Sequence, residues 1–120
     1  MLVEDDEDVR EMLKMTLEGR GYVVELAENG VAALEALDRR RPCLVILDLV
    51  MPVMNGWEVL EQMKARQLSD IPVCVISALG GRAPGEAVAA LTKPFETSAL
   101  LAITDRYCSH GSLPLTQARG

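Results

Sequence analysis

The sequence lacks several features that would assign it to a specialised class of protein. None of its apolar runs approaches the roughly 20 residues that a membrane-spanning helix needs. The N-terminus turns acidic at Glu4, so we expect neither a signal peptide nor contact with a membrane. The 12 Lys and Arg residues are outnumbered by 18 Asp and Glu residues. The resulting net charge of −6 repels phosphate backbones, so we expect no direct binding of nucleic acid.

Cysteine is also scarce, with Cys43, Cys74 and Cys108 as the only three in the chain. Three is an odd number, and the spacings between them are long. This pattern fits neither a disulfide framework nor a zinc site. The cysteines therefore favour a reduced protein in the cytoplasm.

The length and the apolar content of the chain fit one globular domain. Of the 120 residues, 49% are hydrophobic, which is enough for one core, and 25% are charged, as in an ordinary globular protein. We predict a single domain over residues 1–108. Residues 109–120 are polar and show no periodicity, so we predict a flexible tail there.

Segments with helical periodicity alternate with short apolar segments along the chain. The helices are predicted at Asp8–Gly19, from Asn29-Gly30 to Pro42, at Gly56–Gln67 and at Thr97–Cys108, and the strands at Met1–Val3, Tyr22–Leu26, Cys43–Leu47, Ile71–Ile76 and Val88–Leu91. Such alternation predicts an α/β fold, in which a parallel sheet carries helices on both faces. The stretch between Ile76 and Val88 holds three glycines and a proline, so the helix expected there is reduced.

Polar residues stand where the predicted strands end. Glu4 and Asp5 follow the first strand, Asp48 the third, Ser77 the fourth and Lys93 the fifth. Ligands of open α/β sheets bind beyond the carboxyl ends of the strands, so these side chains are expected to converge. Taken singly, each has an ordinary structural explanation, such as acids at a helix N-terminus. Their joint occurrence at strand ends favours a site.

The charges of this cluster indicate a cation. Two carboxylates about 4 Å apart repel each other by roughly 4 kcal/mol at an effective dielectric near 20. Lys93 supplies one compensating charge, and Mg²⁺, which prefers carboxylate and phosphate oxygens, would supply the rest. A carboxylate beside Mg²⁺, a lysine and a hydroxyl suits phosphoryl transfer, with Asp48 as the nucleophile.

Four motifs together resemble the receiver domain of bacterial two-component response regulators. They are V-E-D-D, L-D-L-V-M-P-V-M-N-G, V-I-S-A and L-T-K-P, and the resemblance runs from Leu2 to Tyr107. It implies a flavodoxin-like, doubly wound sheet of five parallel strands in the order 2-1-3-4-5. It also implies that the chain is a signalling module of a phosphorelay and not a metabolic enzyme. The expected partner is a sensor histidine kinase or a phosphotransfer protein. The downstream protein target stays unknown and a homodimer stays open.

The resemblance also implies roles for single residues. Asp48 would accept the phosphoryl group, Ser77 would hydrogen-bond it, and Lys93 would pair with it. The Lys93-Pro94 bond would be cis. Such modules assist their own phosphorylation and dephosphorylation.

The same resemblance implies a Mg²⁺ site. Its ligands would be Glu4, Asp5, Asp48 and the backbone carbonyl of Val50. A register one residue later, with Asp5 and Asp6 as the acidic pair, stays open. We prefer Glu4 and Asp5 because Val3 is the last apolar residue of the strand.

Three features depart from the family pattern. Only 15 residues separate Ser77 from Lys93, the first strand is very short, and Ala90 stands where the family has an aromatic residue that changes position on activation. These departures keep open a degenerate receiver that acts as a phosphorylation-independent docking module. A phosphatase that uses the pattern D-x-D is disfavoured, because Val50 stands where the second acid would be.

Overall fold

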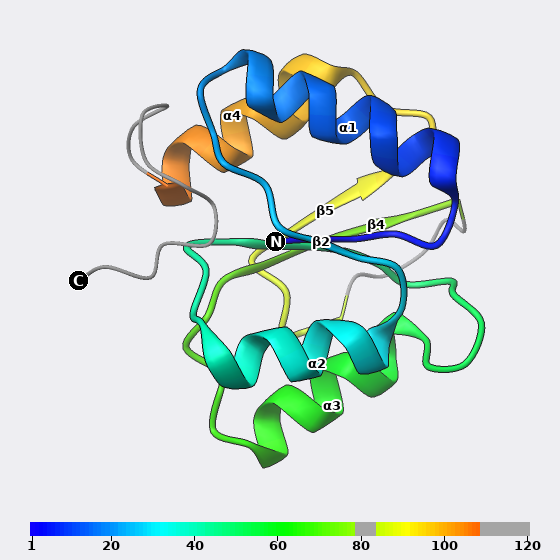
Figure 1. Ribbon diagram of the computed structural model, residues 1–120, viewed down its shortest axis with the longest axis vertical. Coiled ribbons are helices and arrows are strands. Elements are labelled where there is room, and N and C mark those ends of the chain that lie inside the picture. The colour runs from blue at the N-terminus through cyan, green and yellow to red at the C-terminus, as the bar shows by residue number, and fades with distance from the viewer. Residues whose placement is uncertain (79–83, 109–120) are drawn as a thin grey trace.

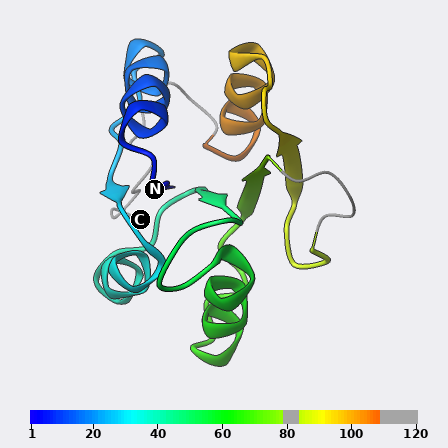
Figure 2. The same cartoon turned by 90° about the vertical axis from the view of Figure 1, so that its right-hand side faces the viewer.

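The computed structural model describes residues 1–78 and 84–108. The strands are β1 (Leu2–Val3), β2 (Leu26–Ala27), β3 (Val45–Asp48), β4 (Val73–Ser77) and β5 (Ala89–Thr92), and the helices are α1 (Glu7–Gly19), α2 (Gly30–Arg39), α3 (Gly56–Ala65) and α4 (Thr97–Cys108). All strand pairs are parallel, in the order β2-β1-β3-β4-β5. Helices α1 and α4 cover one face of the sheet, and α2 and α3 cover the other (Figure 1, Figure 2). The predicted doubly wound, flavodoxin-like fold is confirmed.

Side-chain caps fix where three helices begin. Asp6 accepts hydrogen bonds from the backbone of the first turn of α1, and Asn29 does the same for α2. Asn55 and Glu58 form a reciprocal capping box at the start of α3. Each cap satisfies backbone N–H groups that a helix end leaves without partners. The loops that precede these helices are thereby held at the carboxyl edge of the sheet.

Two apolar cores lie on opposite faces of the sheet. Side chains alternate along β3 and the residue before it, so that Val45 and Leu47 pack with α2 and α3, while Leu44 and Ile46 pack with α1 and α4. All four are fully buried. This double coverage explains why the central strand reads as an unbroken apolar run.

The second strand differs from its prediction. Tyr22 was expected to open it, but β2 contains only Leu26–Ala27. Tyr22 is buried in the core beneath α1 and α4, and its hydroxyl donates to Asp105 of α4. Tyr22 therefore packs against α4 through its ring and its hydroxyl, and it pairs with no neighbouring strand within the described residues.

The described part of the connection from β4 to β5 agrees with the prediction of a reduced helix there. Residues 84–88 form turns and bends with no helix, and residues 79–83 lie outside the described part of the chain. Ala90 in β5 is exposed. The predicted tail over 109–120 also lies outside the described residues.

The expectation drawn from the cysteines is wrong. Cys43 and Cys108 form a disulfide, and of the described cysteines only Cys74 is a free thiol, buried in the core. The fold brings the chain just before β3 against the end of α4, with 5.3 Å between the two Cα atoms. A separation of 65 residues gives no sign of this proximity. The cysteines therefore no longer argue for a reducing compartment.

Candidate functional site

The predicted site residues lie at the carboxyl edge of the sheet. Glu4 follows β1, Asp48 and Ser77 end β3 and β4, and Lys93 follows β5. Asp48 is in register with Ile76, which places Ser77 one residue further along the neighbouring strand. The backbone N–H of Lys93 donates to the carbonyl of Ser77, with 2.7 Å between nitrogen and oxygen. The parallel strands thus gather four segments that are far apart in sequence.

Lys93 connects the two buried acids of this edge. Its ammonium nitrogen lies 3.0 Å from Oε2 of Glu4 and 3.1 Å from Oδ2 of Asp48. The side chain of Glu4 is fully buried, and that of Asp48 is 4% exposed. One cation therefore serves two carboxylates that have little contact with water.

Burial and charge act in opposite directions on these groups. Burial raises the pKa of Glu4 to about 7, and the hydrogen-bonded carboxyl of Asp48 adds to this, while Lys93 opposes it. Burial lowers the pKa of the Lys93 ammonium, but its hydrogen bonds to Glu4 and Asp48 outweigh burial, so its pKa is raised overall. The site therefore holds more negative charge than one lysine balances easily.

A third carboxylate completes an oxygen cluster. One oxygen each of Glu4, Asp5 and Asp48 lie within 4.8 Å of one another, and Asp5 is exposed. Asp6, the acid of the alternative register, caps α1 instead. Three carboxylate oxygens at this spacing fit a hard divalent cation such as Mg²⁺.

The loop after β3 holds Asp48 in place. The backbone N–H of Val50 donates to Oδ1 of Asp48 over 3.0 Å, so both carboxylate oxygens accept a hydrogen bond. Gly56 lies against this loop, and its N–H donates to the carbonyl of Leu49. A Cβ at Gly56 would lie 2.7 Å from the Cα of Leu49, so the close approach requires glycine. The Lys93-Pro94 bond on the opposite side is cis, as predicted.

Two features of the site had no place in the sequence prediction. Arg10 donates to the backbone carbonyl of Glu4 and fixes the turn after β1. A mainly apolar groove of about 560 Å³ opens beside the site, lined by Val9, Met12, Ala78, Lys93, Pro94, Phe95 and Thr97. The helical periodicity of α1 puts Met12 on the apolar face with Val9 and Leu13, yet 48% of its surface is exposed. Only the packing of α1 beside the segment from Lys93 to Thr97 reveals this groove.

Comparison with known proteins identifies the family. The model of the response regulator receiver domain matches residues 1–105. The chain belongs to this family. Receiver domains are signalling modules of two-component systems and interact with histidine kinases or phosphotransfer proteins; they are not classical enzymes.

Relatives and solved structures agree with this assignment. Response regulator MprA of Mycobacterium sp. (strain KMS) is 40% identical over 108 residues, covering 85% of this chain and 46% of the relative, and MprA of Mycobacterium leprae (strain TN) is 41% identical, with 85% and 47% covered. The receiver domain protein (CheY-like) of Methanospirillum hungatei JF-1 superposes with a TM-score of 0.79 at 26% identity, over 89% of this chain and 90% of that one. Response regulator TrrA of Thermotoga maritima, solved in complex with Mg²⁺-BeF, has a TM-score of 0.79 at 28% identity, over 88% and 95%.

The alignments cover only part of each MprA protein. The receiver domain spans about half the length of the MprA proteins that it matches. None of these comparisons supports a degenerate docking module. Among the helices of residues 1–78 and 84–108, none combines the length and the hydropathy that crossing a membrane requires.

Proposed function

We propose that Asp48 accepts a phosphoryl group from the phosphohistidine of a sensor histidine kinase or a phosphotransfer protein, in a Mg²⁺-dependent reaction. The domain, residues 1–108, then signals by a change of conformation. The observation that carries this proposal is the position of Asp48, held between the backbone of Val50 and the ammonium of Lys93 at the carboxyl edge of the sheet. We further propose that the reaction takes place in the cytoplasm and that the phosphorylated domain acts on another protein.

The transfer is a substitution at phosphorus. A carboxylate oxygen of Asp48 attacks the phosphorus atom, the bond to the histidine nitrogen breaks, and the imidazole leaves with the electron pair of that bond. Lys93 is positioned to stabilise negative charge on the phosphoryl oxygens, and the hydroxyl of Ser77 would donate a hydrogen bond to one of them. The protein thereby assists its own phosphorylation.

Mg²⁺ would be held by Glu4, Asp5 and Asp48, with the backbone carbonyl of Val50 as a further ligand. The fit rests on the three carboxylate oxygens within 4.8 Å of one another. When bound, the ion supplies positive charge that offsets the charge of the phosphoryl group and of the carboxylates. TrrA, a structural relative, was solved with Mg²⁺-BeF.

The groove beside the site is the expected contact surface for the phosphodonor protein. It lies directly next to Lys93 and is lined mainly by apolar side chains of α1 and of the segment before α4. A helix that presents an apolar face would bury these side chains and bring its phosphohistidine to Asp48. Met12, which is half exposed, would be covered in such a complex.

Labelling with a small phosphodonor tests the proposal. Wild-type protein incubated with acetyl phosphate and Mg²⁺ should gain one phosphoryl group in its intact mass, and Asp48→Asn should gain none. Asp70→Asn is the matched control, because Asp70 is an exposed acid that pairs with Arg41. Chelation of Mg²⁺ should abolish labelling. A wild-type protein that gains no phosphoryl group, or an equal gain in Asp48→Asn, would refute the proposal.

A further inference from the structure

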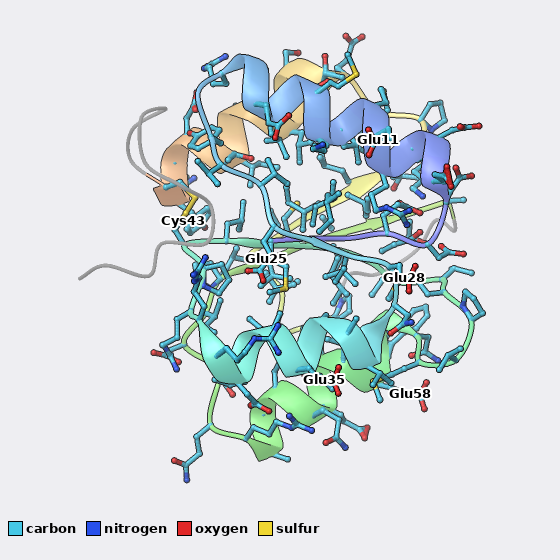
Figure 3. All side chains as sticks on the ribbon, viewed as in Figure 1. Glu11, Glu25, Glu28, Glu35, Cys43 and Glu58 are labelled. Carbon is cyan, nitrogen blue, oxygen red and sulfur yellow. A yellow bond between two sulfur atoms is a disulfide. The ribbon has the colours of Figure 1, made fainter. Side chains whose placement is uncertain are left out.

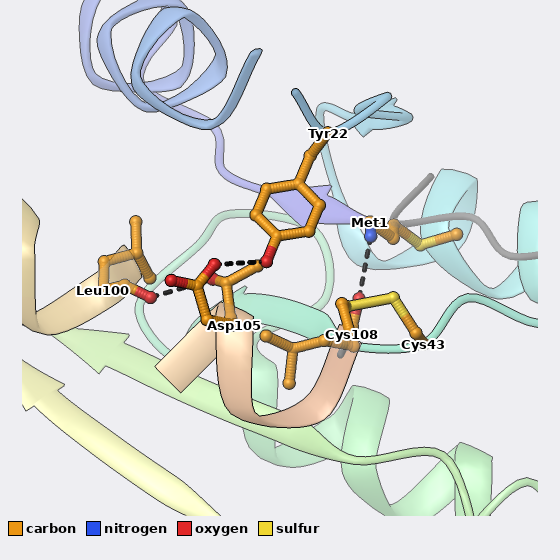
Figure 4. Close-up of a disulfide and its surroundings, with 8 residues drawn as sticks. Met1, Tyr22, Cys43, Leu100, Asp105 and Cys108 are labelled. Atoms are coloured by element: carbon orange, nitrogen blue, oxygen red, sulfur yellow. Dashed lines mark hydrogen bonds between the residues drawn. A yellow bond between two sulfur atoms is a disulfide. The ribbon is translucent and has the colours of Figure 1, made fainter. Parts of the chain in front are cut away.

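We infer that Cys43 and Cys108 form a thiol–disulfide exchange site whose redox state controls how firmly the end of α4 is attached to the sheet. The disulfide joins the segment just before β3 to the last residue of α4. Figure 4 shows it beside Met1, Tyr22 and Asp105, and Figure 3 shows Cys43 at the opposite end of the sheet from Glu28 and Glu58. The bond therefore lies at the far end of the molecule from Asp48.

The same two elements are also connected at the phosphoacceptor end. Asp48 is the last residue of β3, and Lys93 stands four positions before the start of α4. Their ion pair joins the ends of these two segments at the site, and the disulfide joins their other ends. Without the disulfide, noncovalent contacts alone would hold the segment from Lys93 to Cys108 against the sheet.

The noncovalent contacts of α4 predict where reduction acts. Leu100, Thr104 and Cys108 form one buried stripe along the helix. Asp105 accepts hydrogen bonds from Tyr22 and Arg20. These contacts survive reduction and hold most of the helix. The last turn, which ends at Cys108, depends most on the disulfide.

The environments of the three cysteines allow a reversible reaction with one product. Cys43 is partly exposed, whereas Cys108 is 2% exposed, so Cys43 is the more accessible half of the disulfide for an external thiolate. Cys74 is fully buried, and burial raises the pKa of its thiol to about 12, so this thiol does not compete. Exchange therefore interconverts only the Cys43–Cys108 disulfide and the corresponding dithiol.

The reaction balances with glutathione as the partner. The protein dithiol and one oxidised glutathione give the protein disulfide and two reduced glutathiones, through a mixed disulfide at Cys43, and the reverse reaction restores the dithiol. A disulfide in a cytosolic protein is usually transient or redox-sensing, and this step of the argument rests on the cytoplasmic location in the proposed function. The effect of reduction is confined to the last turn of α4, because Thr97, which lines the groove beside the site, lies at the other end of the helix.

Hydrogen exchange and thiol counting under defined glutathione ratios test the inference. The fraction of disulfide, measured by alkylation of the unfolded protein and intact mass, should change reversibly between ratios typical of the secretory pathway and of the cytosol. Reduction should accelerate amide exchange in the last turn of α4 by roughly tenfold or more under native conditions, whereas β3 and β4, which exchange through global unfolding, should report only the loss of overall stability that breaking the cross-link causes. Cys43→Ser and Cys108→Ser should show the reduced pattern at every ratio, and Cys74→Ala should still respond.

Three results would overturn the inference: thiols that stay unpaired at every ratio, a disulfide that no ratio reduces, or exchange in α4 that is equal in both states. Labelling by acetyl phosphate separates this inference from the proposed function. Failure to label Asp48 in both redox states counts against the phosphoacceptor alone, because exchange in α4 is measured without phosphate.

Discussion

The ammonium nitrogen of Lys93 lies 3.0 Å from a carboxylate oxygen of Glu4, although 89 positions separate the two residues in the sequence. The same nitrogen lies 3.1 Å from Asp48. Removing one partner of a buried ion pair costs far more than removing a surface charge, because the remaining charge keeps its burial without compensation. Lys93 is therefore important for the stability of the fold as well as for the proposed reaction.

Replacing Lys93 by Ala should destabilise the protein at neutral pH by up to about 3–5 kcal/mol, since the buried carboxylate of Asp48 would lose its cation, and Glu4, whose pKa Lys93 no longer lowers, would have to take up a proton. Added Mg²⁺ should recover part of this loss, because it supplies positive charge at the same carboxylates. Urea unfolding with and without MgCl₂ measures both effects. The control is Lys64→Ala on the exposed face of α3, which should change stability by no more than about 0.5 kcal/mol. Equal losses in the two variants would contradict this account of Lys93.

The side chain of Val50 predicts a long-lived phosphorylated state. Val50 stands two residues after Asp48, is 48% exposed and has no polar group with which to orient an attacking water. Once labelled by acetyl phosphate, the wild-type protein should lose its phosphate over minutes or longer. Val50→Asn should shorten this lifetime by about tenfold, because its amide can position water.

The control for this lifetime lies in the same loop. Val53→Asn introduces the same amide at a side chain that is 82% exposed, so the lifetime should stay within about twofold of wild type. Phosphate release after removal of the donor gives the three lifetimes. A wild-type half-life of seconds would show that water reaches the acyl phosphate without help from this position.

The parts of the structure that the sequence predicted depend on local patterns. Alternating helical and apolar segments were enough for the fold class, and α4 begins and ends where its periodicity indicated. The grouping of Glu4, Asp48 and Lys93 follows from one rule, that parallel strands bring their carboxyl ends to one edge. The sequence alone was therefore enough to predict that the residues that follow the strands lie close together.

The parts that were missed depend on packing between distant segments. The disulfide needs Cys43 and Cys108 to meet across the end of the sheet, which no spacing encodes. Tyr22 has the composition of a strand residue, yet its hydrogen bond to Asp105 places it against α4. Met12 fits the apolar face of α1, but it lies at the rim of a groove and is half exposed.

Glycine at position 56 should prove necessary for the loop beside Asp48. A Cβ there would meet the Cα of Leu49 at 2.7 Å and the carbonyl oxygen of Asp48 at 2.8 Å, and neither backbone atom moves easily. Gly56→Ala should therefore cost about 1–3 kcal/mol of unfolding free energy. Gly19→Ala, at the end of α1 with no atom within 4 Å of the new Cβ, should instead be neutral or stabilise the helix by up to about 1 kcal/mol. Thermal or urea unfolding of both variants decides the point, and equal effects would contradict it.

The buried hydroxyl of Tyr22 predicts how stability changes at alkaline pH. Burial, together with the hydrogen bond to Asp105, raises the pKa of this phenol to about 12, above its usual value near 10. Because the folded state holds the proton more tightly, the contribution of Tyr22 to stability is complete below about pH 10 and is lost as the pH rises through about 12. The difference in unfolding free energy between wild type and Tyr22→Phe, measured by urea unfolding from pH 9 to about 12, should therefore shrink across this interval. Subtraction of the Phe variant removes the titration of all other groups, so parallel curves for the two proteins would contradict a raised pKa at Tyr22.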